Sequence, residues 1–203
     1  MRAGSPGTDG FRGAANGAQP ASIFDPLGDF YRQLQLPLPK IRQVAAHEVP
    51  EPERRLLVHN RDMTPTLEAA HGRGIHLRVL EHTVSDEVVR RLVALMLDDV
   101  NTPVEMGAIR IFLDRLPASA RDAVLEEREP FGAVLRRTGV THYSRPLGYF
   151  RVTADALMRD ALQIGRRALY GRRNTIWDSG DAPLAEVVEI LPPTRNILEI
   201  NFE

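Results

Sequence analysis

The sequence predicts an α+β fold in which helices pack on a single antiparallel β-sheet. Apolar and polar residues alternate in several runs after residue 75, and a period of two is typical of half-buried strands. Short turn sequences join neighbouring runs as hairpins. Segments with helical periodicity stand before and between these hairpins, which favours α+β over an all-β fold.

Composition indicates one ordinary globular domain with additional unstructured sequence. The 203 residues are 43% hydrophobic and 26% charged, and the net charge of −1 gives no basic field for nucleic acid or an anionic membrane. There are no cysteines, which excludes disulfides, thiolate nucleophiles and cysteine metal sites. No apolar run approaches the ~20 residues of a membrane span, and residues 1–20 lack the apolar core of a secretory signal. We therefore expect a cytoplasmic protein, monomeric or dimeric.

The N-terminal quarter is predicted to hold little regular structure. Residues 1–20 are rich in Gly, Ala, Ser and Pro and are expected to be disordered, leaving 21–203 as the folded domain. Apolar residues at helical spacing predict a helix over 22–35, and four prolines make 37–53 an extended connector. A short helix is expected over 53–59, and a second over 65–71, capped by Thr64 and ended at Gly72.

The strands and the remaining helices follow in order. Strands are predicted over 75–82, 89–97, 105–113, 141–152, 173–178 and 184–191. The turn at 98–103 joins the second and third of these strands as a hairpin. Helices are predicted over 119–127, where Ser119 and Asp122 resemble a capping box, over 130–139 and over 154–162.

Two charged residues interrupt apolar rows of the predicted strands. Arg91 falls among the apolar residues at alternate positions of 89–97, and Glu189 does the same in 185–191. A charge on the inner face of a strand is costly unless it is paired or binds a ligand, so this pair could hold a small anion that carries a hydroxyl group at its far end. The alternative is that both residues lie near strand ends and reach solvent.

Other chemistry is weakly supported. The six histidines form neither a His-x3-His pair nor an HExxH motif, and neither a nucleophile elbow nor a nucleotide-binding motif occurs. We therefore expect no metal and no organic cofactor. Arg166, Arg167, Arg172 and Arg173 form a local basic cluster that could attract an anionic substrate, although a solvated turn is the more usual explanation.

The C-terminal third, IGRRALYGRRNTIWDSGDAPLAEVVEILPP (164–193), resembles the closing segment of chorismate lyases. Glu189 falls at the place of that family's functional glutamate. Four further segments resemble the family in the same order: NRDMTPTLE, VRRLVALML, LDRLP and EPFGAVL. The similarity spans about residues 55–193, and it departs from the family at Ala108, where an arginine is frequent.

The resemblance implies a six-stranded antiparallel sheet with the ligand buried beneath helices. It also implies a cofactor-free carbon–oxygen lyase that eliminates pyruvate from chorismate to leave 4-hydroxybenzoate. Arg91 would bind the ring carboxylate and Glu189 the hydroxyl end, where a raised pKa could assist proton movement. The backbone N–H groups of Met63 and Phe131 would contact the ligand, and Phe131 replaces a leucine of the family.

Two alternatives remain open. The same fold serves as the effector-sensing (UTRA) domain of a family of bacterial transcription regulators, so the chain could bind an aromatic acid without cleaving it. It could also be a degenerate homologue without a ligand, although the charges at Arg91 and Glu189 argue against an empty core.

Overall fold

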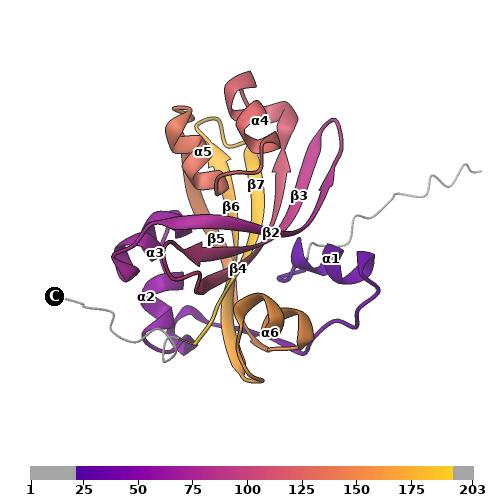
Figure 1. Ribbon diagram of the computed structural model, residues 1–203, viewed down its shortest axis with the longest axis vertical. Helices are drawn as coiled ribbons and strands as arrows, with labels where there is room; N and C mark the ends of the chain where they lie inside the picture. Colours follow the sequence, from indigo (N-terminus) through magenta and orange to yellow (C-terminus); the bar gives the residue numbers. More distant parts are fainter. Residues whose placement is uncertain (1–21, 194–203) are drawn as a thin grey trace, which may run out of the picture.

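The computed structural model describes residues 22–193, which form a seven-stranded antiparallel sheet with helices against both faces (Figure 1). The strands are β1 (Ile41–Val44), β2 (Ile75–Val84), β3 (Val88–Leu97), β4 (Pro103–Phe112), β5 (His142–Thr153), β6 (Ala168–Asp178) and β7 (Pro183–Leu191). Their order across the sheet is β1-β5-β6-β7-β4-β3-β2. The predicted α+β fold with one antiparallel sheet is confirmed, but the sheet has seven strands instead of six. The segment 1–20, predicted to be disordered, lies outside the described residues.

The helices occur where helical periodicity predicts them, but their caps differ. They are α1 (Leu27–Gln33), α2 (Glu53–Leu57), α3 (Met63–His71), α4 (Ala118–Leu125), α5 (Phe131–Arg137) and α6 (Ala156–Leu162), with short 3-10 turns η1 (Ala46–Glu48) and η2 (Leu113–Arg115). The caps expected from Thr64 and Ser119 are wrong, because α3 follows Asp62 and α4 follows Pro117, and neither cap residue makes a side-chain cap hydrogen bond. None of the helices between residues 22 and 193 is long and apolar enough to cross a membrane.

The additional strand, β1, lies in the segment predicted to be an extended connector. Its four residues pair with β5 at the edge of the sheet, with Ile41 opposite Val152. Only Val44 of the four is buried, so this strand has no alternating apolar pattern. An edge strand this short is held by its backbone pairing, which a period of two in the side chains cannot reveal.

The sixth strand begins earlier than predicted, at residue 168 instead of 173. Gly171 lies in this added part, where a Cβ atom would come within 2.6 Å of the Glu189 carbonyl oxygen and would also meet the ring of Phe150. The close approach of β5, β6 and β7 therefore requires glycine at this position. The extension also places Arg172 inside the sheet instead of in a turn.

The two faces of the sheet carry different layers. Helices α1 and α6 cover one face, where Leu92, Met106, Phe150 and Val188 belong to one apolar cluster. Helices α2 to α5 lie over the other face, at the left and top of Figure 1. Because side chains alternate between faces, the second face receives the residues at odd positions of β3, β4 and β7 and at even positions of β6.

Candidate functional site

A cavity lies between this second face of the sheet and the first residues of α3 and α5. We call the two helices α3 and α5 the cover helices. About 70 Å³ is open to the centres of water molecules, which is room for more than one water-sized group. All four residues singled out in the sequence, Met63, Arg91, Phe131 and Glu189, line this one cavity. Residues that lie up to 126 positions apart in the chain are thus brought together by strand pairing and helix packing.

Strand register explains why Arg91 and Glu189 face the same space. Arg91 pairs with Ile109 on β4, which pairs with Val187 on β7. Glu189 is two positions further along β7 and so points to the same face as Val187. Arg91 is 1% exposed and Glu189 is 5% exposed, so the alternative that both reach solvent at strand ends is wrong.

Arg91 supplies an unpaired positive charge to the cavity. Its Nε and Nη1 atoms are buried and have no hydrogen-bond partner among residues 22–193. Burial lowers the pKa of the guanidinium to about 10, against the attraction of Glu127, so the group stays protonated at neutral pH. Oε2 of Glu127 lies 3.2 Å from Nδ1 of His82, and Glu127 does not line the cavity. A buried cation with free donors is stabilised by an anionic ligand that has two acceptor oxygens, such as a carboxylate.

Glu189 is held by an arginine that the sequence did not single out. Nε of Arg172 donates to Glu189 Oε2 across β6 and β7, and Arg172 is fully buried. Its Nη1 donates to the carbonyl oxygens of Leu57 and His59, at 3.2 and 3.0 Å. The solvated turn favoured for this part of the basic cluster is therefore wrong. The alternation Arg172, Asn174, Ile176 places all three on the cavity face, and this is the signal that could have revealed it.

Two further polar residues of the cavity lining were missed. Oε2 of Glu105 and Oδ1 of Asn174 are buried without a hydrogen-bond partner in the part of the chain that the structure describes. Burial, and then the neighbouring charge of Glu189, raise the pKa of the Glu105 carboxyl well above its usual range, and Arg172 offsets only part of this. Glu105 opens its predicted strand, a position at which a charge normally signals solvent.

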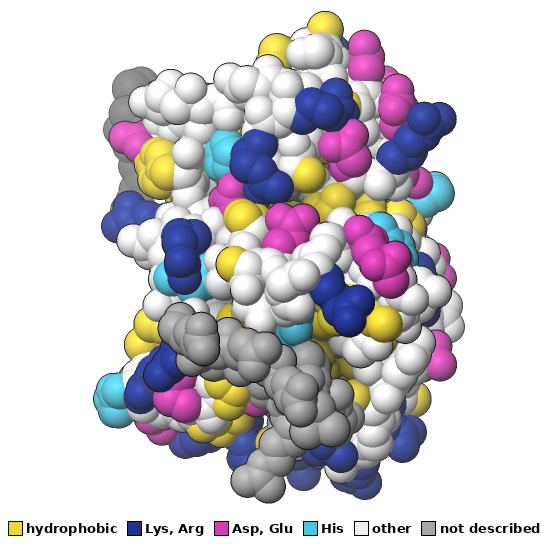
Figure 2. Space-filling model, turned by 60° about the vertical axis from the view of Figure 1, so that its left-hand side comes forward, with side chains coloured by type: hydrophobic (Ala, Val, Ile, Leu, Met, Phe, Trp, Pro, Cys, Tyr) yellow, Lys and Arg dark blue, Asp and Glu magenta, His cyan; other side chains and the backbone are white. Residues whose placement is uncertain are grey.

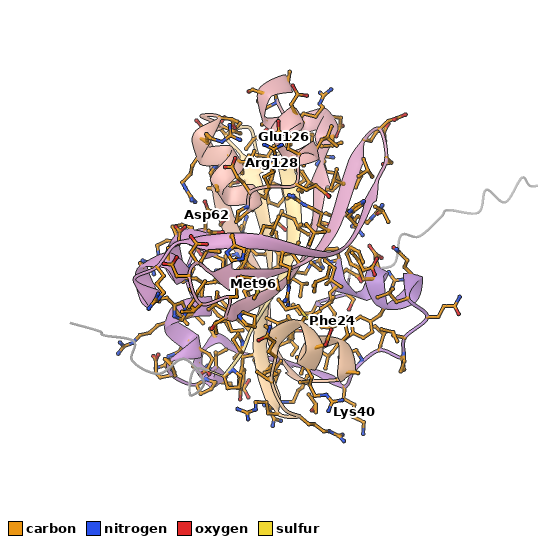
Figure 3. The ribbon with its side chains drawn as sticks, viewed as in Figure 1. Phe24, Lys40, Asp62, Met96, Glu126 and Arg128 are labelled. Atoms are coloured by element: carbon orange, nitrogen blue, oxygen red, sulfur yellow. The ribbon has the colours of Figure 1, made fainter. Side chains whose placement is uncertain are left out.

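Asp62 fixes the start of α3 over the cavity. Figure 3 shows Asp62 between the cover helices, and its carboxylate accepts hydrogen bonds from His142 Nε2 at 2.8 Å and Ser144 Oγ at 2.7 Å. Burial raises the pKa of Asp62, but these two hydrogen bonds, together with the positive charges of His142 and Arg136, hold the pKa below its usual value. The side chain that precedes α3 therefore ties this helix to β5 instead of capping it.

His142 makes this tie pH-dependent. The hydrogen bond to Asp62 raises the pKa of the ring, and Nδ1 lies 2.8 Å from the Val140 carbonyl oxygen, so both nitrogens face acceptors. A raised folded-state pKa stabilises the fold fully below the unfolded pKa of ~6.5, and this contribution is lost as the pH rises through the folded value.

We therefore expect the wild type to lose melting temperature relative to His142→Gln as the pH rises from about 6 to about 9. Thermal unfolding of both proteins across this range measures the difference. His47→Gln, at an exposed histidine, is the control and should follow the wild type. A constant separation between the wild-type and His142→Gln curves would contradict the assignment.

The surface around the cover helices carries mixed charge. Figure 2 shows basic and acidic side chains interspersed on this side, with hydrophobic side chains between them. Within residues 22–193 no group of three or more His, Asp or Glu could hold a metal ion. The buried, unpartnered polar atoms of Arg91, Glu105 and Asn174 lie in the cavity, beneath this surface of mixed charge.

Comparison with known proteins gives the fold and no closer relationship. The chain matches no model of a known protein family and no curated protein. Among solved structures it is similar to the effector domain of PhnF from Mycobacterium smegmatis, with 14% identity over 66% of this chain and 90% of that domain and a TM-score of 0.51. Intact PhnF matches 83% of this chain and 94% of its own, with 14% identity and a TM-score of 0.49.

A GntR-family transcriptional regulator from Bacillus cereus matches with 13% identity over 64% of this chain and 94% of its own, at a TM-score of 0.43. The likeness to the PhnF effector domain shows that this chain has the fold of that domain. Membership of the lyase family itself is not shown by these comparisons.

Proposed function

We propose that the cavity binds a small cyclic carboxylic acid, that this acid is chorismate, and that the protein cleaves it to pyruvate and 4-hydroxybenzoate. The observation that carries the proposal is the unpaired, buried guanidinium of Arg91 in a cavity whose other polar groups include the carboxyls of Asp62, Glu105 and Glu189. Such a cavity has a cationic end for a carboxylate and an acidic end for a hydroxyl or ether oxygen. The segments that resemble chorismate lyases specify the acid.

Arg91 would bind the ring carboxylate through Nε and one terminal nitrogen, which arginine presents in a fixed fork. The carboxylate would remove the cost of the buried, unpartnered donors. Ligand affinity and relief of an unfavourable buried charge thus come from the same contact.

The acidic end of the cavity would receive the ring oxygen. Glu189 lines the cavity while its carboxylate is oriented by Arg172, so it presents a fixed acceptor to a ligand hydroxyl. Met63 and Phe131, the first residues of the cover helices, would offer their backbone N–H groups from the opposite side. The bulk of Phe131, which is 5% exposed, would narrow the cavity around a flat ring.

For this elimination the protein would mainly need to orient chorismate and to exclude water from it. The ring carbon–oxygen bond breaks, the ring loses a proton and becomes aromatic, and the enolpyruvyl group takes up a proton as it becomes pyruvate. Aromatisation drives the reaction, so a buried cavity that holds both ends of the substrate would accelerate it without a cofactor.

A second function, sensing of a small acid without turnover, is favoured by the fold. The PhnF domain, to which this chain is similar in fold, is an effector domain. Sensing would use the same contacts at Arg91 and Glu189, and closure of the cover helices over the ligand would be the signal.

One experiment separates the two functions. Purified protein is mixed with chorismate, and pyruvate and aromatic product are followed by chromatography; in parallel, 4-hydroxybenzoate is tested for a rise in melting temperature. Production of 4-hydroxybenzoate supports the lyase. A thermal shift without turnover supports the sensor, and the absence of both rejects the proposed ligand class. Arg91→Met is the control for each arm.

A further inference from the structure

Glu105 is a carboxyl group of the cavity that the proposed roles of Arg91 and Glu189 leave unused. It lies on β4 opposite Leu95 of β3 and is 4% exposed. It lines the cavity, and its Oε2 has no hydrogen-bond partner within the described chain. Gly107, two positions along the same face, leaves space for it, since a Cβ atom there would come within 2.9 Å of Glu105 Oε1.

The charges around Glu105 favour its neutral form. The charged groups that act on it are Glu189 on β7, which repels a second negative charge, and Arg172 on β6, which attracts one. Arg172 is already engaged by Glu189 and by backbone carbonyls, including that of Arg61 at 3.3 Å. One guanidinium thus faces two buried carboxyls, and the one without an ion-pair partner keeps its proton, because two charges without compensation would be costly.

A neutral carboxyl group differs from Glu189 in what it offers a ligand. A carboxylate only accepts hydrogen bonds, whereas a carboxylic acid also donates one. The position of Glu105 sets which part of the ligand it can reach. Leu95, its partner in the register, is four residues from Arg91 on β3, roughly 13 Å along the strand. Arg91 and Glu105 therefore approach a ligand in the cavity from different ends.

On the basis of the proposed function, we propose that Glu105 is a specificity-determining residue, a protonated carboxylic acid that donates a hydrogen bond to a ligand oxygen at the end opposite the carboxylate held by Arg91. The ligands selected are cyclic carboxylic acids with a hydroxyl or ether oxygen across the ring. Unsubstituted ring acids leave this donor unsatisfied and bind more weakly.

The test compares 4-hydroxybenzoate with benzoate by calorimetry on the wild type, Glu105→Gln and Glu105→Leu. We expect the wild type to prefer 4-hydroxybenzoate by about three- to ten-fold. Glu105→Gln keeps a neutral donor and should keep this preference. Glu105→Leu should abolish it while the affinity for benzoate stays unchanged, which also shows that the variant is folded.

Infrared spectroscopy of the ligand-free proteins tests protonation separately. A carbonyl stretching band of a protonated carboxylic acid is expected at neutral pH in the wild type and should be missing from Glu105→Gln. Equal binding of both acids by the wild type, a preference retained in Glu105→Leu, or no such band would overturn the role of Glu105 and leave the proposed function intact. A wild type that binds neither acid would reject the proposed function, and the role of Glu105 with it.

Discussion

Replacing Arg91 with methionine should weaken binding of 4-hydroxybenzoate by about 2–4 kcal/mol while stabilising the ligand-free protein. The two effects have one cause. The guanidinium is buried with unpartnered Nε and Nη1 atoms, so it destabilises the folded protein when the cavity holds no anion. A bound carboxylate pairs with these donors and removes that destabilisation. Methionine fills similar space without a charge, and the free energy of unfolding without ligand should rise by about 1–4 kcal/mol.

Urea unfolding and calorimetry with 4-hydroxybenzoate measure the two quantities on the same variant. Arg90→Met is the matched control. Arg90 immediately precedes Arg91 on β3, faces the other side of the sheet and has a side chain that is 38% exposed. It should change neither stability nor affinity appreciably. A destabilised Arg91→Met protein that still binds the acid would show that Arg91 is a structural residue and not the carboxylate site.

Replacing Arg172 with methionine should lower the free energy of unfolding by about 3–5 kcal/mol. The change leaves Glu189 buried without its ion-pair partner and close to Glu105. It also removes the donors that hold the carbonyl oxygens of Leu57, His59 and Arg61, the segment that leads from α2 into α3. We therefore expect loss of stability together with loss of order at the start of α3.

Urea unfolding compares this variant with Arg54→Met, whose exposed ion pair with Glu51 has a nitrogen–oxygen distance of 2.8 Å. The exposed pair should contribute less than about 1 kcal/mol. Adding Glu189→Leu to Arg172→Met should recover part of the lost stability, because it removes the unpaired carboxylate. Equal unfolding midpoints for Arg172→Met and Arg54→Met would contradict the importance of the buried pair.

Much of the fold could be predicted because its signals are local. Six of the seven strands show a period of two or sit beside clear turns, and the six helices follow from helical spacing. The strand β1 could not be predicted, since it has one buried residue in four and is held by backbone pairing to β5. The caps were wrong at Thr64 and Ser119 because the chain enters α3 and α4 one residue or more earlier.

The candidate site was predictable only in part, for a similar reason. Arg91 and Glu189 stand out because each interrupts an apolar row within its own strand. Arg172 was attributed to a solvated turn, and Glu105 was not singled out. Both share a face with apolar residues of their strands, Ile176 and Ile109, but both faces of the sheet carry apolar residues, so the sequence does not say which face holds the cavity.

The sequence by itself determined the elements, their antiparallel hairpins and two of the charges that belong in the core, because periodicity and turn chemistry act over a few neighbouring residues. Only the tertiary structure decided which charges are paired. Strand register across β3, β4, β7 and β6 leaves Arg91 without a partner and pairs Arg172 with Glu189. It also leaves Oε2 of Glu105 without a hydrogen-bond partner beside that pair. These outcomes depend on contacts between residues far apart in the chain and on the loss of water around them, and neither is encoded in any single segment.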